Sequence, residues 1–149
     1  MFARFFRLTE RTEERKMILI MLAIGFFMGV FNATYQVVAD AIFLKRLPDQ
    51  LNNAFLSAGV LGILVTSAFS FLQNKIKFSS LVTLSLTLIV IFTAAIYWAY
   101  HFGPSIYHDE VVYMMYCASG PITALSLMSY WGIFGRLFDF RQSKRIISW

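Results

Sequence analysis

Three hydrogen-bonding side chains recur at four-residue spacing inside one long apolar run: Asn32, Gln36 and Asp40, with the phenol of Tyr35 beside them. Amide, carboxylate and phenol groups can bind a polar solute, but this set holds no nucleophile paired with a base. We predict that these four residues line the cavity of a solute pathway. An interhelical hydrogen-bond seam is an equally good interpretation of the same pattern.

The polar residues share one helix face with two glycines, Gly25 and Gly29. At about 100° per residue the five small or polar positions from 25 to 40 fall within an arc of roughly 80°. Polar groups are costly in lipid, so this face must meet protein or water.

A second pattern consists of small residues four apart in the next apolar run: Ala54, Ala58, Gly62, Thr66 and Ser70. Small residues at this spacing let two helix backbones approach closely, so we predict a helix-packing stripe. In the last apolar run, Gly120 and Pro121 predict a kink that could serve as a hinge.

Catalytic and cofactor motifs are missing from the sequence. There is no His-Glu-x-x-His, no phosphate-binding glycine loop and no Gly-x-Ser-x-Gly. His101, His108, Asp109 and Glu110 share one loop, but their spacing matches no strong metal-ligand pattern. We therefore expect no enzyme activity, no cofactor and no metal, and we interpret Cys117 as a small buried hydrophobe.

The elements that carry these residues are four apolar segments, expected as helices at about 17–44, 51–72, 79–100 and 111–138. Of the 149 residues, 58% are hydrophobic and only 14% are charged, whereas a soluble domain has about 25% charged residues. The sequence thus predicts an all-α membrane protein with four transmembrane helices in a lipid bilayer. The third helix, whose polar groups are only Ser and Thr, is expected to be the most lipid-exposed.

Charge predicts the orientation of these helices. Eleven of the 13 Lys and Arg residues flank one end of the helices and only Lys45 and Arg46 flank the other, so both termini are expected in the cytoplasm, in a bacterial inner membrane. Residues 1–16 are expected as a cytoplasmic amphipathic segment and 139–149 as a basic cytoplasmic tail. The basic residues follow the helix ends, so nucleic-acid binding is not expected.

Three stretches carry a family resemblance: ATYQVVADAIFL from Ala33, SAGVLGILVTSAFSFLQNKIKFS from Ser57 and WGIFGRLFDFRQSKR from Trp131. Their order resembles the start of the ATP/ADP antiporter-like (nucleotide translocase) branch of the major facilitator superfamily. The resemblance implies a partial major-facilitator-type bundle, in which the first and fourth helices line the cavity and the third lies outside. The intramembrane basic residues with which that family holds phosphates have no counterpart in the first apolar run.

The expected function is therefore that of the N-terminal portion of a facilitator-type secondary transporter, which contributes one wall of an alternating-access cavity. This function requires further transmembrane helices missing from this chain, and a small-molecule solute whose class the residues leave open. The alternative is a stand-alone four-helix membrane subunit that anchors or scaffolds a partner protein.

Overall fold

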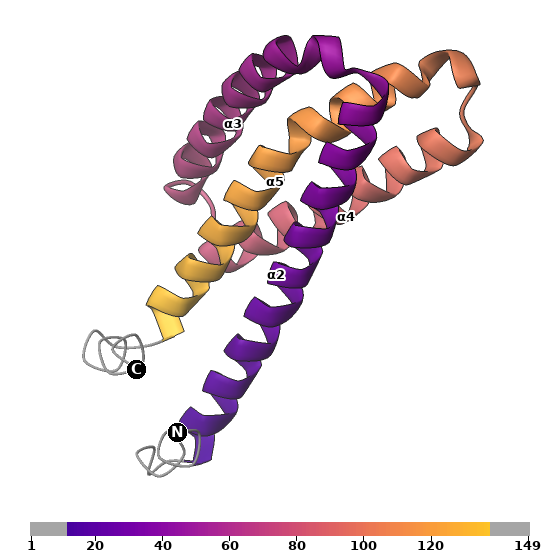
Figure 1. The fold of residues 1–149 in the computed structure, drawn as a ribbon. Coiled ribbons are helices and arrows are strands. Elements are labelled where there is room, and N and C mark those ends of the chain that lie inside the picture. Colours follow the sequence, from indigo (N-terminus) through magenta and orange to yellow (C-terminus); the bar gives the residue numbers. More distant parts are fainter. Residues whose placement is uncertain (1–11, 138–149) are drawn as a thin grey trace.

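The computed structural model describes residues 12–137, which form four long helices and two short 3₁₀ turns (Figure 1). The elements are α2 (Thr12–Arg46), η1 (Pro48–Gln50), α3 (Leu51–Gln73), α4 (Phe78–Phe102), η2 (Ser105–Tyr107) and α5 (His108–Leu137). Within this range no residue belongs to a strand.

All four helices are long and apolar enough to cross a membrane, which confirms the expected all-helical membrane class. Their ends lie within five residues of the predicted bounds, and the largest difference is at the first helix, which begins at Thr12 instead of Met17. Residues 12–16 are thus continuous with α2. Residues 1–11 and 138–149, which hold the rest of the expected amphipathic segment and the basic tail, lie outside the described range.

The bundle is organised around α5, which packs against each of the other three helices. In Figure 1, α2 and α3 are joined at one end and splay apart on either side of α5, while α4 crosses behind. The first turns of α2 and the last turns of α5 lie at the same end of the molecule.

Small buried residues let α4 lie close to α5. The ring of Phe78 on α4 occupies the space where Gly132 would carry a Cβ atom, and further along the antiparallel pair Ile89 packs with Ile122 and Ile96 with Met115. The buried polar residues of the described chain all belong to these two helices: Ser85, Ser126 and Ser129. Small side chains at such positions allow close backbone approach and dense packing.

The expectation that the third helix is the most lipid-exposed is wrong. Six residues of α4 are buried, whereas only Ala54 and Phe69 are buried in α3. The physical reason is that α4 packs against α5 and α2 along much of one side, through residues such as Phe92 and Ile96. The buried contacts of α3 lie only near its two ends, where Ala54 packs with residues of α2 and α5 and Phe69 packs with residues of α4. The small residues of α3 indicated close packing. The length of its contact with α5, however, depends on how far these two helices stay side by side.

Candidate functional site

The core-facing side of α2 is anchored to α5 near both of its ends. Ile18 and Met21 pack with Phe134 near one end, while Ala39 and Phe43 are fully buried near the other. Phe43 stacks on Tyr116 of α5, with ring centroids 4.2 Å apart. These contacts fix which face of α2 turns toward the bundle, and thereby where the predicted polar residues lie.

Two of the predicted solute-facing residues lie at the edge of this packed face. Tyr35 is half-buried, and its hydroxyl donates a hydrogen bond of 3.1 Å to the backbone carbonyl of Met115. Asn32 is also partly buried, and its Oδ1 is enclosed without a hydrogen-bond partner in the described chain. Tyr35 therefore joins two helices, whereas the acceptor of Asn32 lacks the partner that a buried amide ordinarily finds.

The other two predicted residues lie further from the core: Gln36 is exposed and Asp40 is half-exposed. Gln36 lies seven residues before Phe43, hence only about 20° away around the helix, and Phe43 belongs to the cluster that joins α2 to α3 and α5. Gln36 therefore faces the side on which α2 and α3 splay apart. The structure keeps the polar residues on one strip, encloses the Oδ1 of Asn32 and leaves Gln36 exposed.

Part of α5 is uncovered on the same side. Tyr116 and Tyr130 contact α2, and Cys117 contacts α3 through a 3.6 Å hydrogen bond from its Sγ to the carbonyl of Ala54. Between these two sides α5 exposes Gly120, Leu127 and Trp131. Together with the exposed strip of α2 these residues form what we term the open face: Gly29, Gln36, Gly120, Leu127 and Trp131.

At the two glycines of the open face, Gly29 and Gly120, the helix backbone itself is exposed. A Cβ atom added at Gly29 or Gly120 would meet no other atom within 4 Å. Gly25, one turn earlier on α2, differs, because a Cβ there would lie 3.0 Å from the hydroxyl oxygen of Tyr130. Close packing thus reaches Gly25 and stops before Gly29.

The predicted packing stripe of α3 is used over only part of its length. Ala54 is fully buried and Ala58 packs against the same cluster, but an added Cβ at Gly62 would meet nothing within 4 Å. The hydroxyl of Thr66 donates to the carbonyl of Gly62 in its own helix, at 2.8 Å, and Ser70 is exposed.

An additional α3–α5 contact escaped the sequence analysis. The hydroxyls of Ser57 and Tyr113 share a 2.9 Å hydrogen bond across these helices. The two residues lie 56 positions apart in the sequence, so no local pattern could pair them.

The predicted hinge lies within an uninterrupted helix. α5 continues through Gly120 and Pro121, with Pro121 buried and Gly120 exposed. A role of Gly120 and Pro121 as a hinge stays a prediction.

A second interhelical cluster, absent from the sequence analysis, joins three helices at the end where α2 meets α3. Arg46 forms an ion pair of 3.5 Å with Asp109, and its guanidinium lies 5.6 Å from the ring centroid of Tyr100. Tyr100 in turn stacks on His108 at 5.3 Å. No group of three or more His, Cys, Asp or Glu side chains that could hold a metal occurs among the described residues.

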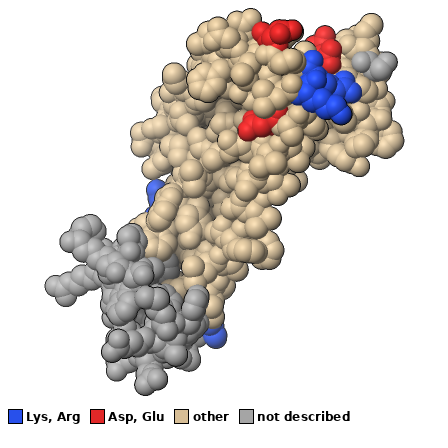
Figure 2. All heavy atoms as spheres, viewed as in Figure 1, with Lys and Arg blue, Asp and Glu red and all other residues tan. Residues whose placement is uncertain are grey.

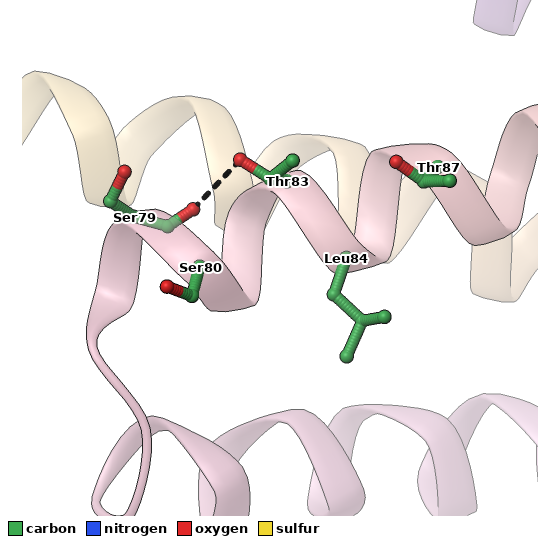
Figure 3. A pocket seen from close by; sticks show the side chains of 5 residues that line it. All are labelled: Ser79, Ser80, Thr83, Leu84 and Thr87. Carbon is green, nitrogen blue, oxygen red and sulfur yellow. Dashed lines mark hydrogen bonds between the residues drawn. The ribbon is translucent and has the colours of Figure 1, made fainter.

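A hollow lies on the surface of α4 (Figure 3), and none of the residues described above lines it. It measures about 420 Å³ and is lined by Ser79, Ser80, Thr83, Leu84 and Thr87. The hydroxyl of Thr83 donates to the carbonyl of Ser79 at 3.0 Å. Because the buried residues of α4, such as Phe78 and Val82, lie on its opposite side, the hollow opens to the exterior of the bundle.

Charge is distributed unequally between the two ends. On the face in Figure 2 the acidic side chains lie near one end, around a basic cluster. By sequence, the flanks at the end with Lys45 and Arg46 hold three acidic residues, Asp49, Asp109 and Glu110, which gives a net charge of −1. The flanks at the other end hold eleven basic and four acidic residues, a net charge of +7.

No protein-family model, no curated protein and no solved structure matches this chain. The ATP/ADP antiporter-like resemblance therefore stays a prediction that depends on the three quoted stretches.

Proposed function

We propose that this protein is a membrane-integral component of a larger helical assembly, in which further transmembrane helices cover the open face and enclose a pathway for a polar solute. A facilitator-type secondary transporter is the assembly that fits best. The first and fourth helices, α2 and α5, then contribute the wall of the pathway.

The exposed amide of Gln36 is the observation that carries this proposal. Gln36 lies about 15 Å along the helix axis from Arg46, within the apolar span. An amide transferred from water to a medium without hydrogen-bond partners costs roughly 4–8 kcal/mol. Contact with protein or water removes that cost, and contact with lipid does not.

The charge asymmetry supports an orientation for the assembly. The end with a net charge of +7 faces the cytoplasm under the positive-inside rule, and both termini then lie in the cytoplasm of a bacterial cell. A reporter fused after residue 149 tests this orientation, because a reporter active only outside the cytoplasm is expected to stay inactive there.

Cysteine accessibility tests the pathway itself. Gln36→Cys is made in a Cys117→Ala background and exposed to a membrane-impermeant thiol reagent in intact membranes. Reaction at position 36 is expected if water reaches the open face. Val37→Cys is the matched control, since Val37 is 67% exposed and turned about 100° away, toward lipid.

The test also separates the proposal from its alternative, a membrane anchor or scaffold. That alternative draws support from the location of the hollow, which lies on α4 and away from the polar strip. Protection of position 36 combined with crosslinking to another protein favours the scaffold. Equal, low reactivity at 36 and 37 without crosslinking contradicts both functions, because Gln36 would then face lipid.

A further inference from the structure

The turn between α3 and α4 carries two exposed lysines, Lys75 and Lys77, that no function proposed above uses. The ammonium of Lys75 lies 4.4 Å from the ring centroid of Phe71. At the same end, the guanidinium of Arg136 lies 4.0 Å from the ring centroid of Phe78. A ring face attracts the cation without consuming all its N–H donors, which stay available to an anion.

The hollow of α4 begins two residues after Lys77 (Figure 3). Ser79, Ser80, Thr83 and Thr87 line it with hydroxyl groups and Leu84 lines it with an apolar side chain, and in this view Ser80 and Leu84 lie on the same side of the helix. A membrane-spanning helix that turns this side outward presents the hollow to lipid. A ligand there must combine a polar group near the turn with an apolar part along α4.

The charge of the protein at this end determines whether the polar group of the ligand is expected to be anionic or cationic. By sequence the flanks at this end hold eleven basic and four acidic residues, a net charge of +7, and the basic residues include Lys16, Lys75, Lys77 and Arg136. An anionic group is attracted to this end, whereas a zwitterionic headgroup gains less.

We propose that the α3–α4 turn and the hollow of α4 bind an anionic phospholipid. Its phosphate lies near Lys75, Lys77 and Ser80, and an acyl chain follows Leu84 and Thr87 along the outside of the helix. The occupant is a lipid and not a soluble phosphate, because the site opens from the side of a transmembrane helix.

Native mass spectrometry of the full chain tests this proposal. The protein, purified in a neutral detergent, is titrated in parallel with phosphatidylglycerol and phosphatidylcholine, and the bound fraction of each lipid is measured. The wild type is expected to prefer phosphatidylglycerol. In Lys75→Gln/Lys77→Gln the preference is expected to fall, by roughly fivefold for each lysine.

Two further variants sharpen the comparison. Lys45→Gln removes an exposed basic residue from the opposite end and is expected to keep the preference. Ser80→Leu keeps all the lysines but fills the hollow, and is expected to weaken phosphatidylglycerol binding. Circular dichroism in phosphatidylcholine checks that each variant retains the helical content of the wild type.

Three results would overturn the proposal. The first is an unchanged preference in both the double lysine variant and Ser80→Leu. The second is an equal loss in Lys45→Gln, which would indicate unspecific attraction by total charge. The third is full competition by inorganic phosphate, which would indicate a site for soluble anions.

Discussion

The ring of Phe78 lies where a side chain at position 132 would be, so α4 and α5 can approach closely only because residue 132 is glycine. A Cβ atom at this position would lie 2.9 Å from Cε2 of Phe78 and closer still to Cζ. Phe78 is itself buried and carries the guanidinium of Arg136 on its face. One glycine thus sets the start of α4 against the end of α5.

Gly132→Ala is expected to destabilise the bundle by about 1–3 kcal/mol, because a rigid buried ring must move to admit the methyl group. Reversible unfolding in mixed micelles gives the free energy. Gly135→Ala is the matched control: it lies one turn later, and an added Cβ there meets nothing within 4 Å. Equal effects of the two substitutions would contradict the close contact.

Ser129→Ala is expected to leave the free energy of unfolding unchanged or to raise it by about 1 kcal/mol. The Ser129 side chain is fully buried, and its Oγ has no hydrogen-bond partner in the described chain. Removing a buried polar atom that lacks a partner relieves a desolvation cost. The same unfolding measurement checks this, and a loss of more than 1 kcal/mol would show that the hydroxyl makes a stabilising bond.

Tyr35→Phe is expected to lower the free energy of unfolding by about 0.5–1.5 kcal/mol, because it removes the hydrogen bond to the carbonyl of Met115 and leaves the ring in place. Tyr97→Phe serves as the control, since Tyr97 is 62% exposed. If Tyr35 instead contacts the solute of a transporter, its substitution alters transport without this change in stability.

The ion pair between Arg46 and Asp109 is expected to contribute little. Its side chains are 37% and 64% exposed, and such pairs are worth about 0.2–1 kcal/mol. A double-mutant cycle with Arg46→Gln and Asp109→Asn measures the coupling. The coupling should shrink as salt is added, and a larger, salt-independent value would show that the pair is shielded from solvent.

The sequence was informative wherever a property depends on neighbouring residues. Hydropathy over 20 or more residues predicted the four helices, with ends within five residues of those observed. The polar strip of α2 was also predictable, because helical periodicity alone places Asn32, Gln36 and Asp40 on one side.

The location of the contacts was less predictable. The stripe from Ala54 to Ser70 predicted packing along all of α3, yet the structure uses its Ala54 end, while Gly132 and Ser129 make the tight contact elsewhere. Small residues permit close approach on any helix. Which of them are used depends on the partner surface, here Phe78, more than 50 residues away in the chain.

The amino-acid sequence by itself determined that this chain has four membrane-length apolar helices, and it placed nearly all the basic charge at one end of them. Transfer to lipid and attraction to one membrane face are sums over local side chains, so they need no knowledge of the fold. Only the tertiary structure decided that α5 is the central helix, that Tyr35 is bonded within the bundle and that Gln36 stays uncovered. Those outcomes depend on the fit between surfaces of different helices, a property that no single segment contains.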